Sequence, residues 1–220
     1  MGNTRAYKQF KVNTANYSKK DFASAQKEAD IALQQFISAF DSESLSNGED
    51  AMKAAEAHRF VIMGVSGSGK SSIGALLAEN IGATFQDSDD FHSSTNKALM
   101  AAGISLSNAD RLPWLNSIGE LLRDSSAEER PIVVACSALK KSYRDVLREF
   151  DPDVFFIHLY GSRENIEQRL SIRTHEFMPL SLLDSQFAIL EPLQSNERGL
   201  GVDIDGTPEE ILERISREIS

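Results

Sequence analysis

Residues 59–80 have the sequence RFVIMGVSGSGKSSIGALLAEN, in which a short apolar run leads into a glycine-rich turn. The turn at 64–71 fits the pattern G-x-x-x-x-G-K-[ST], whose glycines let backbone N–H groups point inward around a phosphate chain. The apolar spacing that follows predicts a helix over 70–81, and a helix N-terminus attracts anions. A strand, this loop and a helix in that order predict a phosphate-binding loop.

The motif predicts how each part of the loop would bind a nucleoside triphosphate. Lys70 would reach the β- and γ-phosphates, and the Ser71 hydroxyl would bind Mg²⁺. The alternative is a Gly/Ser-rich loop without a ligand, which the flanking strand and helix disfavour. The predicted nucleotide-binding residues are Gly64, Val65, Ser66, Gly67, Ser68, Gly69, Lys70, Ser71 and Ser72.

Composition and charge limit the classes of partner. The 220 residues contain 41% hydrophobic and 25% charged residues, as soluble globular proteins do, and no apolar run is long enough to span a bilayer. A formal net charge of −10 disfavours nucleic acid and anionic membranes. The single cysteine, Cys136, fits a reducing compartment, so we expect a cytoplasmic protein with a buried, inert thiol.

From residue 59 onward, strand and helix patterns alternate. Alternation of this kind predicts an α/β fold with a parallel sheet and helices on both faces. The expected strands lie at 59–64, 83–86, 131–136, 154–160 and 201–204, and the expected helices at 70–81, 94–102, 110–125, 138–149, 163–173, 179–190 and 207–219.

The first 57 residues form a separate N-terminal extension in this interpretation. Residues 1–20 carry five basic residues and no acid, which predicts a basic tail; a mitochondrial presequence is the alternative. Apolar residues then recur at three- or four-residue steps from Phe22 to Phe40, which predicts an amphipathic helix. The catalytic domain is expected to cover residues 58–220.

Two carboxylates separated by one residue follow the second expected strand, in the segment FQDSDDF at 85–91. In open parallel sheets, ligands bind beyond the carboxyl ends of the strands. Asp87 would hold Mg²⁺ through water, and Asp89 would bind a substrate hydroxyl and accept its proton. A solvated acidic turn is the alternative. His92 is a candidate substrate contact.

Basic side chains downstream are candidates for binding an anionic acceptor. Arg111 carries a guanidinium, which grips carboxylates with two parallel hydrogen bonds. A helix beginning beside Ser137 would direct N–H groups at the site, and Lys140 and Arg144 would share one face of it. A solvated basic face is the alternative. Asp110 is expected to be the N-cap of the helix expected at 110–125.

Arg169 and Arg173 are four residues apart on an expected helix that ends before the break at 174–179. Such a segment predicts a mobile lid that closes the two arginines over the transferring phosphoryl group and excludes water. Ordinary surface arginines are the alternative.

Several of these segments resemble signatures of the gluconate kinases, which are P-loop kinases related to shikimate and adenylate kinases. The likeness covers residues 58–219 and rests on DRLPWL at 110–115, CSALKKSYRD at 136–145 and DSQFAILEP at 184–192. It implies a three-layer P-loop kinase fold with a helical lid. It also implies ATP-dependent phosphorylation of D-gluconate to 6-phospho-D-gluconate, and a homodimer.

The chain departs from that family pattern at several positions. Asn108 and Ser105 stand where the family usually has aspartate and proline, and Leu99 stands where it has lysine. The lid histidine, His175, is shifted by one position. These departures bear on selectivity and rate more than on the reaction class.

Two other functions stay open at this point: a kinase for another small hydroxy acid such as shikimate, and a nucleotide-binding regulator built on a kinase scaffold. The segments around Ser137 and Gln186 argue against the first. Residues 96–99 lack the aspartate of the guanine-binding motif Asn-Lys-x-Asp, which argues against a GTPase switch. The presence of Lys70 and Asp89 argues against an inactive enzyme.

Overall fold

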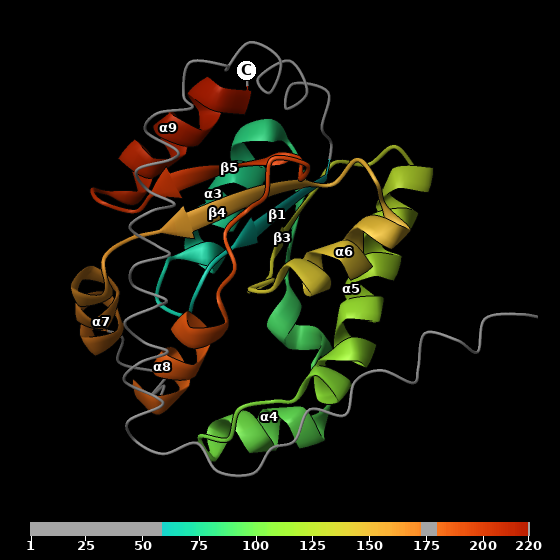
Figure 1. Cartoon of the computed structure of the whole chain (residues 1–220). Helices are drawn as coiled ribbons and strands as arrows, with labels where there is room; N and C mark the ends of the chain where they lie inside the picture. Colours follow the sequence, from blue (N-terminus) through green and yellow to red (C-terminus); the bar gives the residue numbers. More distant parts are fainter. Residues whose placement is uncertain (1–58, 173–179, 220) are drawn as a thin grey trace, which may run out of the picture.

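The computed structural model describes residues 59–172 and 180–219, which form a five-stranded sheet with helices on both faces (Figure 1). Neighbouring strands pair in parallel, in the order β2-β3-β1-β4-β5. The expected α/β class with a parallel sheet is confirmed. The strands are β1 (Arg59–Met63), β2 (Thr84–Asp87), β3 (Ile132–Ala135), β4 (Phe155–Tyr160) and β5 (Gly199–Asp203).

The helices lie close to the expected ranges, with most ends moved by one to three residues. The described helices are α3 (Lys70–Ile81), η2 (a 3-10 turn, Ser88–Phe91), α4 (Ser94–Ala101), α5 (Asn108–Ala127), α6 (Lys141–Phe150), α7 (Arg163–Ile172), α8 (Leu180–Ile189) and α9 (Pro208–Ile219).

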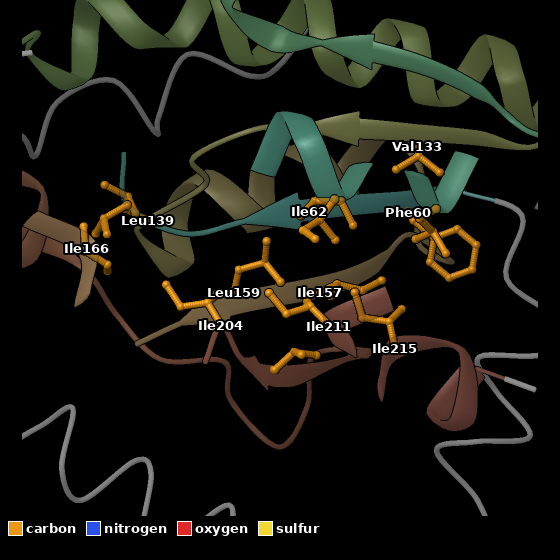
Figure 2. Close-up of a cluster of buried hydrophobic side chains, with 14 of the residues drawn as sticks. Phe60, Ile62, Val133, Leu139, Ile157, Leu159, Ile166, Ile204, Ile211 and Ile215 are labelled. Atoms are coloured by element: carbon orange, nitrogen blue, oxygen red, sulfur yellow. The ribbon is translucent and has the colours of Figure 1, made fainter. Parts of the chain in front are cut away.

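The central strand β1 is buried on both sides, and successive side chains point to opposite faces of the sheet. Phe60 and Ile62 join a core with Ile73 of α3 and with Ile211 and Ile215 of α9. Figure 2 shows this cluster, with Ile157 and Leu159 of β4 pointing toward the same helices.

On the other face, Val61 and Met63 join a second core that contains Trp114 and Ile118 of α5 and Leu147 of α6. The two cores make the three layers: α3 and α9, the sheet, then α5 and α6 (Figure 1). A strand buried on both faces explains the continuous apolar run at 60–63.

The start of α5 differs from the expectation in its capping residue. Asp110 is not the N-cap: the helix begins at Asn108, and Ser107 caps it by accepting a hydrogen bond from the Asp110 N–H at 3.2 Å. The Asp110 carboxylate accepts in return from the Ser107 N–H at 2.8 Å, which completes a capping box.

The connections after β1 and β3 diverge to opposite faces of the sheet, and we call the carboxyl end of the sheet between them the crevice. The loop after β1 leads to α3 on one face, and the loop after β3 leads to α6 on the other. Ligands of open α/β sheets bind at such a point. Helices α4, α7 and α8 lie beyond this end of the sheet (Figure 1).

The expected extension at 1–57, Arg173 and the rest of the expected lid at 174–179 lie outside the described residues. Within the part of the chain that the structure describes, no helix combines the length and apolarity needed to cross a bilayer.

Candidate active site

The loop between β1 and α3 is in close contact with β4 and α7. Gly64 has a φ of +141°, and a Cβ there would lie 2.5 Å from the Leu159 carbonyl oxygen of β4. Gly67 has a φ of +84°, and its Cβ would lie 2.7 Å from Leu170 Cγ of α7. These two positions therefore require glycine. Gly69, with a φ of +93°, is the N-cap of α3.

Lys70 and the peptide group between Val65 and Ser66 lie together at the centre of the loop. Lys70 Nζ donates to the Val65 carbonyl oxygen at 3.0 Å. The N–H of the same peptide, on Ser66, donates to Gln186 Oε1 of α8 at 2.6 Å. The loop thus holds an ammonium group where the motif requires one, and it contacts a helix that lies far away in sequence.

The other loop residues take different environments. Val65 is buried and its side chain belongs to the α3–α9 core. Ser68 is fully buried, and its N–H donates to the Val65 carbonyl at 3.2 Å. Ser72 is exposed on the first turn of α3. For Val65, nucleotide contact is therefore limited to the backbone.

Ser71 and Asp87 form the predicted oxygen pair. Ser71 Oγ donates to Asp87 Oδ2 at 2.6 Å, and Asp87 Oδ1 accepts from the Asp89 N–H at 3.0 Å. Hard oxygen donors are what Mg²⁺ prefers, and it takes one or two carboxylates together with substrate phosphates. Within the described residues no group of three or more His, Cys, Asp or Glu could hold a metal. The residues therefore fit Mg²⁺ bound together with a phosphate chain.

Cys136 directly follows β3 and is fully buried. Burial raises the pKa of its thiol to about 12, to which the negative charge of Asp89 contributes, while Lys70 acts in the opposite direction. The thiol stays protonated at neutral pH, which confirms the expected buried, inert cysteine. Lys70 and Asp89 therefore both lie close enough to Cys136 to affect the pKa of its thiol.

His92 packs flat against Trp114 of α5. Its ring stacks on Trp114 with centroids 4.4 Å apart, and Trp114 Nε1 donates to the Ser88 carbonyl at 2.7 Å. Burial, together with the charges of Arg111 and Lys97, lowers the pKa of His92 to about 4. His92 is therefore neutral at physiological pH and presents a hydrogen-bonding ring rather than a cation.

Arg111 and Lys140 meet in a cluster that two further residues hold together. Asn108 Oδ1 accepts from Tyr143 Oη at 2.6 Å and from Lys140 Nζ at 3.3 Å. The Arg111 guanidinium carbon lies 5.8 Å from the Tyr143 ring centre, and Lys140 Nζ lies 5.6 Å from it. Two cations therefore share one aromatic ring. We refer to Asn108, Arg111, Lys140 and Tyr143 as the cationic cluster.

Tyr143 and Asn108 were missed as site residues by the sequence analysis. Tyr143 lies inside one of the segments that carry the family resemblance, and Asn108 was noted only as a departure from the family. The missing information was the pairing between α5 and the start of α6, which no local pattern contains.

The structure contradicts the prediction that Arg144 contacts substrate. Arg144 is fully buried and pairs with Glu197 through Nε at 2.6 Å and Nη2 at 2.9 Å. Its remaining N–H groups donate to backbone carbonyls, including those of Glu191 and Pro192 at 3.0 Å. Arg144 therefore fastens the 191–197 segment to α6 instead of facing an acceptor.

The helix after β3 also begins later than expected. It starts at Lys141, because Ala138 adopts a φ of +41°, and the Lys141 N–H donates to Glu191 Oε2 at 2.5 Å. The expected N–H groups beside Ser137 are therefore not those of a helix terminus. The Ser137 carbonyl instead accepts from the Gly64 N–H at 3.3 Å, which ties this loop to the phosphate loop.

Arg169 lies at the phosphate loop and the segment after β5. Its Nη2 donates to the Ile204 carbonyl at 2.5 Å and the Gly206 carbonyl at 3.2 Å, and its Nε donates to Asn165 Oδ1 at 3.1 Å. A Cβ on Gly69 would lie 3.8 Å from Arg169 Nη1. The guanidinium therefore lies between α7, the phosphate loop and the 204–206 segment.

The class of protein follows from the position of the phosphate loop, which joins the carboxyl end of the central strand of a parallel sheet to the N-terminus of α3. This is the arrangement of a P-loop kinase. In agreement, a family model described as "Shikimate kinase" matches residues 66–219.

Within that class, similar proteins identify the family. The chain is 44% identical to a probable gluconokinase of Rattus norvegicus, over 68% of this chain and 91% of that protein. A crystal structure of a gluconokinase from Sinorhizobium meliloti 1021 aligns with a TM-score of 0.68 and 42% identity, covering 73% of this chain and 90% of that one. An unliganded sugar kinase from Janibacter sp. HTCC2649 aligns with a TM-score of 0.70 and 45% identity, covering 73% and 93%. The chain belongs to the gluconokinase family.

A second family model, the TipAS antibiotic-recognition domain, matches residues 1–102. That match spans less than half of the chain. Its last part, from residue 59, coincides with β1, the phosphate loop, α3, β2 and α4 of the kinase fold.

Proposed function

We propose that this chain transfers the γ-phosphoryl group of ATP to the 6-hydroxyl of D-gluconate, giving 6-phospho-D-gluconate and ADP. The order of groups along the crevice carries the proposal. Asp89 follows two residues after Asp87, the His92 N–H donates to the Asp89 carbonyl at 3.4 Å, and Arg111 lies close enough to His92 to lower its pKa. A carboxylate near the phosphates and cations farther away match a sugar acid with a hydroxyl at one end and a carboxylate at the other.

The proposed reaction is a single displacement. The acceptor hydroxyl oxygen forms a bond to the γ-phosphorus, the bond from that phosphorus to the β–γ bridging oxygen breaks, and its electron pair leaves with ADP. Asp89 orients the hydroxyl and takes its proton. Lys70 stabilises the negative charge on the phosphate oxygens. Ser71 and Asp87 would hold Mg²⁺, which neutralises phosphate charge when bound.

The arginines have different places in this proposal. Arg169 contacts the 204–206 segment and the phosphate loop, so we assign it to nucleotide binding and to the charge of the phosphate chain. Arg173 is proposed to join it on the lid. In the acceptor half, Arg111 and Lys140 bind the carboxylate, and His92 and Ser137 contact hydroxyl groups.

We also propose a cytoplasmic homodimer. The family resemblance supports the dimer, and a single buried thiol supports a reducing compartment. Light scattering on the purified full chain tests the dimer: a mass of one chain at working concentration contradicts it.

The function is tested by ADP release from the full chain with Mg-ATP, comparing D-gluconate, shikimate, glucose and no acceptor. Strong stimulation by gluconate alone is the expected result. Stimulation by shikimate instead would assign a different acceptor to the same site. Intact ATP binding without stimulation by any acceptor would favour a regulator built on a kinase scaffold.

A further inference from the structure

Three consecutive residues of α8 contact three separate parts of the site. Asp184 accepts a hydrogen bond from Arg163 at the start of α7, Ser185 Oγ accepts one from Ser105 Oγ at 2.9 Å, and Gln186 Oε1 accepts one from the Ser66 N–H at 2.6 Å. Successive helix residues point about 100° apart, so one turn can reach three neighbours. α8 thus connects α7, the segment between α4 and α5, and the phosphate loop.

The orientation of the Gln186 amide is determined by its partner. A backbone N–H can only donate, so the atom that faces Ser66 must be the carbonyl oxygen Oε1. The two N–H groups on Nε2 therefore point elsewhere. No acceptor for them is found among residues 59–172 and 180–219. Gln186 brings two hydrogen-bond donors to the phosphate loop without a charge.

The Ser66 N–H belongs to the same peptide group whose carbonyl accepts from Lys70. In a trans peptide the N–H and the C=O point in opposite directions. Lys70 and Gln186 therefore hold this peptide from its two sides. A shift of Gln186 would let the peptide rotate, and the carbonyl that Lys70 contacts would rotate with it.

Gln186 is not needed to dock α8. Leu183 is fully buried and Phe187 nearly so, and both belong to the main core. The pair between Asp184 and Arg163 fastens the same turn to α7. A side chain that contributes little to docking, yet contacts the phosphate loop at 2.6 Å, has its main effect on the loop.

The geometry points to Gln186 as a positioning residue for phosphoryl transfer, an inference that rests on the proposed kinase function. Through Oε1 it holds the peptide between Val65 and Ser66 in one orientation. Through Nε2 it offers two donors that no residue among 59–172 and 180–219 accepts and that the acceptor substrate would accept. The contact between Ser105 and Ser185 joins the segment between α4 and α5, which precedes Asn108 and Arg111, to the same helix turn.

Two substitutions separate these roles. Gln186→Met keeps the length of the side chain but removes the acceptor and both donors. Gln186→Glu keeps an oxygen that can accept from Ser66 but removes the donors. The matched controls are Gln168→Met and Gln168→Glu, because Gln168 is exposed on α7 and its side chain has no described role at the site.

The measurements are kcat and KM for acceptor-dependent ADP release, ADP affinity by calorimetry, and ATP hydrolysis without acceptor. Gln186→Met is expected to lose about tenfold or more in acceptor-dependent kcat, because misplacement of reacting groups by small distances has effects of that size or larger. Gln186→Glu is expected to lose less than Gln186→Met but to stay below the wild type, because it keeps the acceptor for the Ser66 N–H and lacks only the Nε2 donors. ADP affinity and acceptor-free hydrolysis should stay within about twofold. The Gln168 variants should match the wild type.

Several results would overturn the inference. One is a wild-type kcat in Gln186→Met. Another is a wild-type kcat in Gln186→Glu, which would remove the role of the Nε2 donors. A third is a loss of ADP affinity and of acceptor-free hydrolysis as large as the loss of acceptor-dependent kcat. That result would mean that Gln186 only stabilises the phosphate loop.

A failure of the proposed substrate is distinguishable from these outcomes. If shikimate or glucose stimulates the wild type in place of gluconate, the acceptor assignment fails and the Gln186 comparison is made with that acceptor. If no acceptor stimulates the wild type, the kinase function and the role of Gln186 fall together.

Discussion

The nucleotide side and the acceptor side of the crevice are built in different ways. The nucleotide side is one contiguous run, Gly64–Ser71, whose geometry comes from backbone groups and glycine conformations. The acceptor side that we propose combines side chains of separate elements: His92 after η2, Arg111 on α5, and Lys140 and Tyr143 at the start of α6. Local sequence is sufficient for the first side, whereas the second depends on how α5 packs against α6.

The largest expected effect is on the nucleotide side. Lys70→Ala should lower kcat for ADP release by about 1,000-fold or more, because the ammonium group meets the charge that develops in the transition state. The free energy of unfolding should change by less than about 1 kcal/mol, since Lys70 belongs to neither hydrophobic core. A wild-type kcat in Lys70→Ala would contradict the assignment of residues 64–71 as a phosphate-binding loop.

Asp89 lies where the two sides meet. Asp89→Asn should lower kcat by about 100-fold or more, which is the usual contribution of a general base. ATP affinity should change little, because Asp87 rather than Asp89 accepts from Ser71. Steady-state kinetics measures kcat, and nucleotide titration measures the ATP affinity. An unchanged kcat in Asp89→Asn would contradict the role of Asp89 as the general base.

Lys140 and Arg144 are four positions apart, and substituting each one tests which of them serves the proposed acceptor site. Arg144→Met should destabilise the fold by about 3–5 kcal/mol, because it leaves Glu197 buried without its partner. Lys140→Met should leave the melting temperature unchanged and raise the acceptor KM. Denaturant unfolding and kinetics of both variants provide the test. A stable Arg144→Met protein with a raised acceptor KM would restore the original prediction for Arg144.

Asn108 tests whether the cationic cluster needs a hydrogen-bond acceptor. Asn108→Ala should raise the acceptor KM about five- to tenfold, because Tyr143 and Lys140 lose their shared partner. Asn108→Asp, which restores the residue usual in the family, should stay within about twofold of wild type, since a carboxylate accepts both hydrogen bonds. The control is Ala109→Asp, which adds the same charge one residue away. Equal losses in both Asn108 variants would contradict the role.

The smallest effect concerns pH. The pKa of His92 is lowered to about 4 in the folded protein from an ordinary 6.5, so the unfolded state binds the proton first as the pH falls. Stability present above about pH 6.5 is therefore lost progressively toward pH 4. Between pH 7 and 4.5 the melting temperature of wild type should fall a few degrees more than that of His92→Gln. If the melting temperatures of wild type and His92→Gln fall equally with pH, the pKa of His92 is not lowered in the folded protein.

Much of the fold could be predicted because its signals are local. The run at 60–63 is apolar on both faces, and helices α3 and α9 follow their sequence patterns within a residue or two. The start of α6 could not be placed, because a left-handed Ala138 delays the helix and Glu191, fifty residues later, caps it. Nothing near Ala138 in the sequence contains that information.

The amino-acid sequence by itself determined the phosphate loop, the alternation of strands and helices, and the oxygen pair of Ser71 and Asp87. In each case, the controlling interactions are between near neighbours or depend only on the carboxyl edge of a parallel sheet. Tertiary structure alone decided which basic residues are available to a ligand. Arg144 and Lys140 look equivalent along the chain, but Arg144 is buried in a pair with Glu197, whereas Lys140 lies beside the Tyr143 ring. Long-range packing decides which of the two charges loses its contact with water.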